Sequence, residues 1–182
     1  MIAYKGFNKG LECRGYKFKM GLNTTSKAQA VNCGFHCAED PLDCLTYYGN
    51  MKQAEYYIVN AGGDIDEDGS DTKIACTELT IIQKLTKEDF VLHALAFMTD
   101  HPKRKWNRYV GKDHATQNEH GFAIARGKDP IAKGRKGCIL AFAKEDAAGN
   151  IQEVAMAAVD GVQIKADQWY GIDLSEREVA DP

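Results

Sequence analysis

The chain has 182 residues, of which 44% are hydrophobic and 27% charged, and its formal net charge is −3. This length and composition support one substantial core with a small appended subdomain. No apolar run approaches the roughly 20 residues that cross a bilayer, and the first residues form no apolar signal core. We therefore expect a cytoplasmic protein with no membrane partner.

The first 50 residues are predicted to hold short strands and one or two short helices. Strand patterns cover residues 2–7 and 16–20, and residues 26–31 fit one helical turn. Asp40 is suited to cap a helix, and Pro41 is suited to its first turn. We expect that helix to end at the next glycine along the chain.

Two further strands and a longer helix are predicted next. Residues 55–59 and 72–82 are rich in β-branched and aromatic residues, which favour strands. An acidic, glycine-containing turn separates them. Thr86 with Asp89 forms a capping box for a helix that ends shortly before Pro102.

The C-terminal third is punctuated by glycine. Residues 121–127 and 131–134 are small-residue units that resemble a worn β-solenoid repeat. Strands at 138–143 and 152–159 follow, and residues 176–182 are expected to form a frayed tail.

These elements predict an α+β fold. The expected architecture is a mixed or antiparallel sheet with two or three helices over residues 1–100. A basic connector would then cover residues 101–120, and a small β-rich C-terminal subdomain would cover residues 121–182.

The segment from Gly34 to Asp43 places an imidazole and a thiol side by side just before the predicted helix. Cys33, His36 and Cys37 are the candidate metal ligands, but structural zinc prefers paired Cys-x-x-Cys knuckles and no second pair exists. A structural junction is the alternative, which we favour. The six cysteines lack the spacing of a disulfide scaffold, so we predict reduced, mostly buried thiols.

A nucleophilic role for Cys37 with a nearby histidine is a further alternative. Adjacent residues on a strand face opposite ways, which disfavours His36 and Cys37 as a working pair. We predict no catalytic residue and no cofactor. The phosphate-binding glycine loop with a following Lys and Ser or Thr is absent as well.

Asp64, Asp66, Asp68 and Gly69 match the first half of a calcium-binding loop. Ala75 stands where the twelfth position of that loop requires an acidic residue. We expect a solvated acidic hairpin tip in place of a calcium site.

Charge is segregated along the chain. Residues 1–100 sum to −4, residues 101–136 to +7 and residues 137–182 to −6. Lysine and arginine that neutralise phosphates release counterions, so a basic window with interleaved aromatic residues favours binding to DNA, RNA or an acidic protein surface. The alternative is a solvated face that only balances the acidic segments. The candidate partner-binding residues are Lys103, Arg104, Lys105, Trp106, Arg108, Lys112, Arg126, Lys128, Lys133, Arg135 and Lys136.

Several motifs in combination resemble a domain of unknown function that is common in phages and prophages of gut Firmicutes. The motifs are Ala3-Tyr4-Lys5-Gly6-Phe7-Asn8, Cys13-Arg14-Gly15-Tyr16, Gly34-Phe35-His36 through Pro41-Leu42-Asp43, and Asp160-Gly161 with Ile164 to Tyr170. Relatives often carry many glycine- and alanine-rich repeats, of which this chain keeps about two. They also tend to place the cysteine two residues after the histidine, whereas Cys37 follows His36 directly.

Within this group the chain is similar to anti-CRISPR proteins that inhibit type II-A Cas9. The resemblance implies a non-enzymatic inhibitor that binds Cas9 or another host defence nuclease, with double-stranded DNA as a second candidate partner.

The order of elements also resembles that of ADP-ribosyltransferases, which implies an alternative function as an enzyme, active or degenerate, that modifies a host protein. The shared features are Tyr4 to Phe7, Gly34 to His36, Tyr47-Tyr48 and the strand Tyr56 to Val59. Lys5 stands where those enzymes carry a His-Gly or Arg-Gly strand that holds the nicotinamide cofactor.

Overall fold

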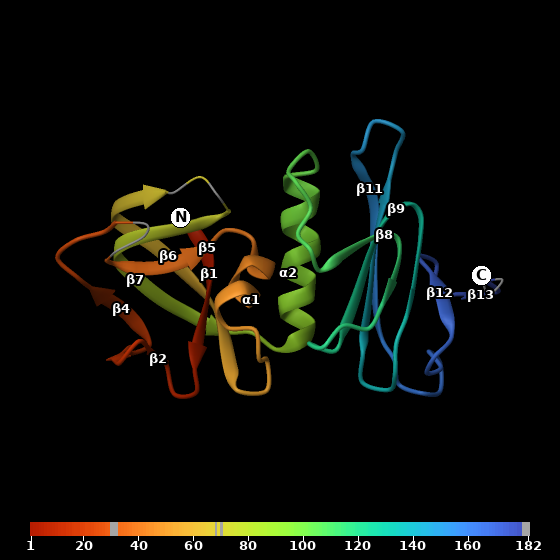
Figure 1. Ribbon diagram of the computed structural model, residues 1–182, viewed down its shortest axis with the longest axis horizontal. Helices are drawn as coiled ribbons and strands as arrows, with labels where there is room; N and C mark the ends of the chain where they lie inside the picture. The colour runs from red at the N-terminus through yellow and green to blue at the C-terminus, as the bar shows by residue number, and fades with distance from the viewer. Residues whose placement is uncertain (30–32, 68, 70, 180–182) are drawn as a thin grey trace. The chain divides into compact units, whose positions relative to one another are not determined.

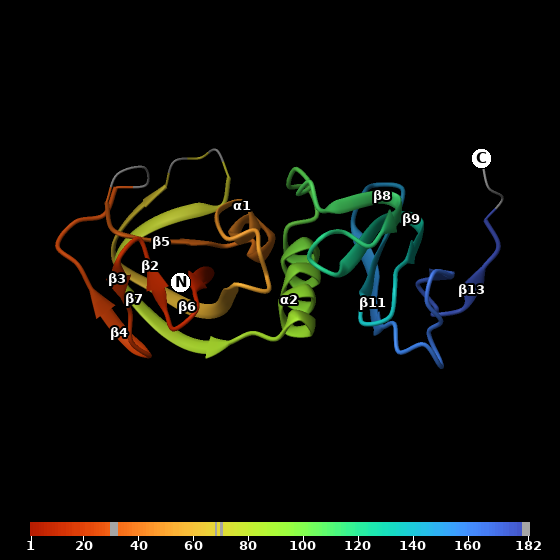
Figure 2. The same ribbon diagram turned by 60° about the horizontal axis from the view of Figure 1, so that its bottom comes forward.

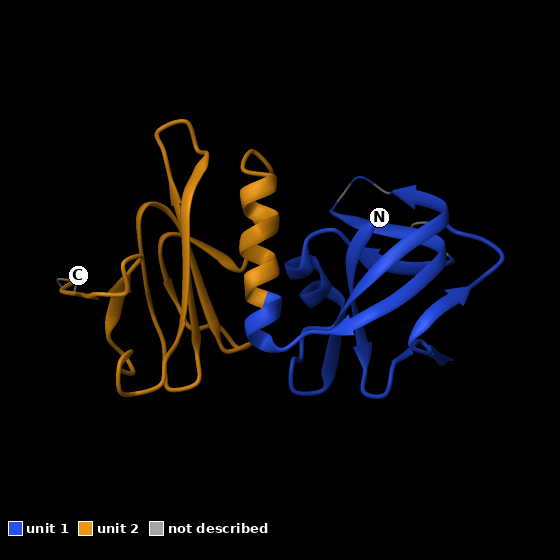
Figure 3. Ribbon diagram, turned by 180° about the vertical axis from the view of Figure 1, so that it is seen from behind, with its two compact units in different colours: residues 1–90 blue, residues 91–182 orange. Residues whose placement is uncertain are grey.

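The computed structural model describes residues 1–29, 33–67, 69 and 71–179, and the chain divides into two compact units, Met1–Phe90 and Val91–Pro182 (Figure 3). The protein is mostly β, with 49% strand and 12% helix. The elements, drawn in Figure 1, are β1 (Ile2–Asn8), β2 (Glu12–Cys13), β3 (Tyr16–Lys17), β4 (Gly21–Thr24), β5 (Phe35–Ala38), the 3₁₀ helix η1 (Pro41–Asp43), α1 (Cys44–Tyr47), β6 (Ala54–Glu67), β7 (Lys73–Lys84), α2 (Lys87–Asp100), β8 (Val110–Thr116), β9 (Phe122–Lys133), β10 (Ile139–Glu145), β11 (Ile151–Ala158), β12 (Trp169–Gly171) and β13 (Glu176–Arg177).

The predicted α+β class is wrong, because helices are fewer and shorter than expected. Residues 26–29 form no helix, and Gln29 instead pairs with Cys33 in an isolated bridge; the rest of that predicted turn lies outside the described residues. The predicted acidic turn is largely strand, since β6 continues through Gly62 and Gly63 with a register shift against β7. A bulge lets a long strand absorb the glycines without ending.

Other predictions for this half are confirmed. Asp40 caps η1 by accepting a hydrogen bond from the Leu42 amide at 2.9 Å, with Pro41 in the first turn. The Thr86 hydroxyl accepts from the Asp89 amide at 3.1 Å, and the Thr86 amide donates to Asp89 Oδ2 at 3.1 Å, which is the reciprocal capping box at the start of α2. Local hydrogen-bonding chemistry fixes both starts, so sequence pattern was sufficient to locate them.

In the first unit, four antiparallel strands close on themselves. β1 pairs with β5 and β6, and β7 also pairs with β5 and β6, so the hydrogen bonds run around a ring (Figure 2). The order of the seven described strands is β3-β2-β1-β5-β7-β4, with β6 joined to β1 and β7. β2, β3 and β4 therefore extend the ring on two sides.

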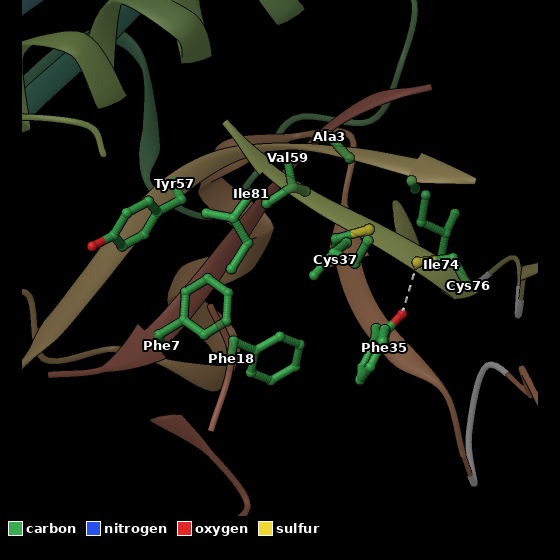
Figure 4. Close-up of a cluster of buried hydrophobic side chains, with 12 residues drawn as sticks. Ala3, Phe7, Phe18, Phe35, Cys37, Tyr57, Val59, Ile74, Cys76 and Ile81 are labelled. Carbon is green, nitrogen blue, oxygen red and sulfur yellow. Dashed lines mark hydrogen bonds between the residues drawn. The ribbon is translucent and has the colours of Figure 1, made fainter. Parts of the chain in front are cut away.

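The core of the first unit lies within this ring and is apolar (Figure 4). Ala3 and Phe7 of β1 belong to it, together with Cys37, Val59 and Ile81. Side chains alternate along a strand, so Lys5 shares the face of Ala3 and Phe7. β1 consequently places a lysine on the same face as its core side chains.

In the second unit, β8, β9 and β10 pair in parallel, and β11 adds antiparallel to β10. β8 shifts register between Lys112 and His114, and its partners on β9 jump from Arg126 to Ile131 at the same level. Around residues 124–126, β9 therefore lies between β8 and β10, and all three strands run in the same direction. The glycine-punctuated units around residues 121–134 form the middle layer, and β8 lies within the segment that we expected to be a connector.

The core of this second unit is built from small residues around a few large ones. Ala123, Ala125 and Ala132 of β9 pack in one cluster with Phe142 and Tyr170. Small side chains let the stacked strands lie close together. The segment of α2 from Val91 onward runs beside this sheet (Figure 3). Among the described residues, no helix has the length and apolar character required to cross a membrane.

Candidate functional site

A cavity of about 350 Å³ opens into the first unit. It is lined by segments of β1, β2, β3, β5, β7 and α1, and by residues that connect these elements. The lining residues are Tyr4, Lys5, Gly6, Cys13, Arg14, Tyr16, Phe18, Thr25, Cys33, Gly34, Phe35, His36, Cys37, Ala38, Cys44, Tyr47, Tyr48 and Lys73. This volume lies at the lower end of the range of small-molecule sites, about 300–1,000 Å³.

Lys5 is the most unusual residue of the cavity wall, because only 4% of it is exposed. Its ammonium donates to the His36 carbonyl at 2.6 Å and contacts Cys13 Sγ at 3.9 Å. It also lies 5.1 Å from the ring centroid of Phe7 and 5.5 Å from that of Phe18. Cation–π attraction and one carbonyl hold the ammonium in place, and among the described residues it forms no ion pair with a carboxylate.

Gly6 explains how Tyr48 reaches the cavity wall. A Cβ at Gly6 would lie 2.7 Å from Tyr48 Cδ2, so only glycine leaves space for that ring against β1. The Tyr48 hydroxyl donates to Cys13 Sγ at 2.7 Å. Burial, and then the hydrogen bond to Cys13, raise the pKa of Tyr48, so this phenol stays protonated as a donor.

Tyr47 and Lys73 form another part of the wall. Lys73 Nζ donates to the Tyr47 hydroxyl at 3.3 Å and lies 5.4 Å from its ring centroid. The Tyr47 hydroxyl in turn donates to Asp71 Oδ2 at 3.1 Å. Burial raises the pKa of Tyr47. Asp71 is thus an acidic neighbour of the cavity, although it is not part of the lining.

Two of the four cysteines that line the cavity, Cys37 and Cys44, are unsuited to nucleophilic attack. A hydrogen bond with Cys76, followed by burial, raises the pKa of Cys37 well above its usual value. Burial raises the pKa of Cys44 to about 12. Because the thiolate is the reactive form of cysteine, these two thiols are inert at neutral pH. All six cysteines are free thiols, and four of them are buried.

Cys33, His36 and Cys37, the candidate metal ligands, line the cavity but face different ways. Cys37 belongs to the apolar core, whereas His36 is its neighbour on β5 and points to the other face. Among the described residues, no group of three or more His, Cys, Asp or Glu side chains could hold a metal ion.

Gly34 gives this segment a structural role. Its φ is +96°, and a Cβ there would lie 2.9 Å from Ala28 Cα and 3.2 Å from the Cys76 carbonyl oxygen. Any other residue would strain the backbone and push two segments apart. The stretch before η1 is therefore a tight packing junction, as the alternative interpretation of the sequence proposed.

The acidic residues of the calcium-loop pattern do not form a compact loop. Asp64 and Asp66 lie within β6, and Ala75 lies within β7. Asp68 lies outside the described residues. Asp64 and Asp66 follow an extended strand, whereas a calcium-binding loop folds back on itself so that its ligands surround one ion.

Arg126 is buried, with 2% exposure, so its place among the partner-binding residues is wrong. Its guanidinium contacts Glu145 Oε1 at 2.7 Å through Nε and 2.6 Å through Nη2, and donates to the Pro102 carbonyl at 2.6 Å. Trp106 covers it, with Cζ 4.6 Å from the ring centroid. These two residues hold the second unit together, and the charge of Arg126 is neutralised inside it.

Most of the other basic side chains remain on the surface. Lys133 is half-buried and lies over the Trp169 ring at 4.7 Å. Lys103 donates to the Ala148 carbonyl, and Arg108 donates to the Tyr109 hydroxyl at 2.8 Å. The exposed basic surface of the second unit is defined by Lys103, Arg104, Lys105, Arg108, Lys112, Lys128, Arg135 and Lys136.

Sequence reasoning missed the cavity. One signal was present: Lys5 interrupts the inward-facing positions of β1, between Ala3 and Phe7. A charged residue at a core position of a strand marks either an error in the register or a functional site. Its surroundings come from β2, β5 and α1, which no local pattern brings together.

The comparisons with known proteins give a family and no function. The family model of a domain of unknown function, DUF7666, matches residues 1–93. That match covers half of the chain, so the chain belongs to this family. No curated protein and no solved structure matches it. The matched region contains the whole cavity and all four strands of the ring.

Proposed function

We propose that the protein is a phage or prophage anti-defence protein that inhibits a type II-A CRISPR nuclease in the cytoplasm of its bacterial host. It binds Cas9 through the exposed basic surface and also contacts double-stranded DNA there. The observation that carries this proposal is the set of eight exposed lysine and arginine side chains within a window of 36 residues. The same window exposes three acidic residues, Asp113, Glu119 and Asp129.

An excess of positive charge of this kind complements the surface of a nuclease that carries RNA and DNA. Charge complementarity steers encounter and fixes orientation more than it sets the final affinity. Lysine and arginine also neutralise phosphates and release counterions, which makes DNA binding strongly dependent on salt. Inhibition would then follow from occupation of a surface that the nuclease needs for its DNA target.

The test is an assay of DNA cleavage by purified Cas9 with its guide RNA, in the presence of this protein. One variant reverses Lys103, Arg104, Lys105 and Arg108 to glutamate, and a second reverses Lys112, Lys128, Arg135 and Lys136. We expect at least one of the two to lose inhibition, and the difference between them would locate the contact.

The matched control reverses four exposed lysines of the first unit, Lys9, Lys19, Lys27 and Lys52. Reversal to glutamate there changes the net charge by the same amount, and this control should inhibit like the parent. Inhibition that persists in both basic-surface variants would refute the proposal. Binding of each variant to duplex DNA alone, measured in parallel, separates contact with DNA from contact with Cas9.

The cavity bears on the alternative function as an ADP-ribosyltransferase-like enzyme. Cleavage of a glycosidic bond passes through a cationic sugar, which enzymes stabilise with a nearby carboxylate. None of the described lining residues is Asp or Glu. The cavity therefore favours a site that binds a ligand without transferring ADP-ribose. When labelled NAD is incubated with this protein and a cell lysate, no label should appear on any protein.

A further inference from the structure

The cavity of the first unit has a positively charged wall. Three of its lining residues are cationic, Lys5, Arg14 and Lys73, and none of the described lining residues is acidic. Burial of an ammonium is costly unless an opposite charge compensates it. Lys5 is buried with only a carbonyl, a thiol and two rings as its described partners. An anion in the cavity would supply the opposite charge that Lys5 does not meet among the described residues.

The same wall is rich in aromatic rings. Tyr16, Phe18 and Phe35 form a cluster in which the Tyr16 and Phe18 centroids lie 4.6 Å apart and the Phe18 and Phe35 centroids 4.9 Å apart. Tyr47 lines the cavity as well. Tyr16 is 45% exposed and Tyr47 is 50% exposed, so both offer ring surface to an occupant. Planar ligands gain stacking energy on such rings.

We propose that this cavity binds a nucleoside monophosphate, with its phosphate near Lys5 and Arg14 and its base against the tyrosines. A cationic wall beside aromatic rings matches a ligand that joins a planar ring to a phosphate. The volume of about 350 Å³ suits a mononucleotide and is small for a dinucleotide. The site concerns the first unit alone, so it does not depend on the proposed inhibition of Cas9.

The local sequence prepares this site before any ligand arrives. Lys5 is fixed by the His36 carbonyl, and Tyr48 is fixed by the space at Gly6 and its bond to Cys13. Groups that are already held in place lose little conformational entropy on binding.

The experiment titrates the full-length protein with AMP, GMP, CMP and UMP by isothermal calorimetry. Adenosine lacks the phosphate, ribose 5-phosphate lacks the base, and inorganic phosphate lacks the whole nucleoside. We expect at least one nucleotide to bind at least tenfold more tightly than each of its fragments, because both halves of the cavity contribute. If no nucleotide binds, the proposal is wrong.

Two variants test the cationic wall. Lys5→Met nearly keeps the length of the buried side chain and removes its charge. Arg14→Gln removes the charge at an exposed position and leaves the core unchanged. Loss of a charge-assisted hydrogen bond should weaken nucleotide binding roughly tenfold or more. Lys9→Gln removes an exposed charge nearby that does not line the cavity and should bind like the parent.

The same variants and probes give the results that would contradict nucleotide binding in the cavity. If Lys5→Met does not fold, Arg14→Gln alone tests the cationic wall, because Arg14 is exposed and its replacement should not disturb folding. Nucleotide affinity that is unchanged in Arg14→Gln would refute the cationic role. Equal affinity for adenosine and AMP would refute the phosphate site, and equal affinity for ribose 5-phosphate and AMP would refute the aromatic one.

Discussion

Arg126 joins three segments of the second unit through contacts with Glu145, the Pro102 carbonyl and Trp106. Removal of one member of a buried ion pair leaves the other charge uncompensated. We expect Arg126→Met to lower the free energy of unfolding by about 3 kcal/mol, measured by urea denaturation. The double variant Arg126→Met with Glu145→Gln should recover part of that loss. If the single variant is as stable as the parent, Arg126 is not the structural link described here.

His120 gives the second unit a dependence on pH. Burial, aided by the Arg108 charge, lowers the pKa of His120 in the folded protein below the ordinary histidine value of 6.5, although Glu119 Oε1 lies 3.4 Å from Nε2. Between the folded pKa and 6.5, His120 is therefore protonated in the unfolded chain and neutral in the folded chain. Stability should be highest above pH 6.5 and should fall as the pH drops from there toward the folded pKa.

His120→Gln tests this dependence because it removes the titrating ring. Melting temperatures of the parent and the variant, measured between pH 8 and pH 5, should converge as the pH falls. If the melting temperatures of the two proteins fall in parallel as the pH drops, groups other than His120 cause the loss of stability in acid.

At the scale of elements, the start of α2 rests on its capping box. Thr86→Ala removes both hydrogen bonds that the threonine hydroxyl shares with Asp89. The expected loss of stability is about 1 kcal/mol. Thr99→Ala, which removes a hydroxyl bonded to the Leu95 carbonyl inside the same helix, should be neutral or stabilising. A loss at Thr99 as large as that at Thr86 would contradict a specific cap.

The packing junction before η1 rests on Gly34. Gly34→Ala introduces a Cβ that meets backbone atoms of two segments at a φ of +96°. Gly15→Ala is the matched control, because its φ is +78° but no atom lies within 4 Å of the new Cβ. The control should cost about 1–2 kcal/mol through backbone strain alone. Gly34→Ala should cost clearly more in the same chemical denaturation experiment, and equal losses would argue against close packing.

Elements defined by their own residues could be predicted from the sequence. The cap at Asp40, the capping box at Thr86 and the first strand all follow from local chemistry. β6 could not be delimited, because Gly62 and Gly63 indicate a turn unless β7 pairs across them. β8 could not be predicted, because the charged residues of the basic window mask any strand pattern and the strand forms only by pairing with β9.

The candidate sites divide in the same way. Exposed charge is a property of the sequence, so most of the basic surface could be predicted. Burial of Arg126 depends on Glu145 and Trp106, which only the fold brings to it. The cavity could be recognised only from the structure, because it depends on the closed ring of β1, β5, β7 and β6. Among the lining residues of the cavity, only Lys5 could be singled out from the sequence, because it is a charged residue at an inward-facing position of β1.

At the scale of the whole molecule, the two candidate surfaces belong to different units. The cavity lies in Met1–Phe90, and the exposed basic surface lies in Val91–Pro182. Variants in one should therefore leave the other intact. We expect Arg14→Gln to weaken nucleotide binding while leaving inhibition of Cas9 unchanged, as measured by calorimetry and DNA cleavage on the same preparation. Loss of both activities would show that the sites are coupled.

The proposed inhibition requires the basic surface of the second unit to bind Cas9 electrostatically. The most direct test measures the affinity for the purified Cas9–guide RNA complex as a function of sodium chloride concentration. Screening weakens attraction between exposed charges as salt rises. The parent protein should lose affinity steeply, whereas the variant reversed at Lys103, Arg104, Lys105 and Arg108 should bind weakly with a shallow dependence. A parent affinity that is independent of salt, or equal in the two proteins, would contradict the claim.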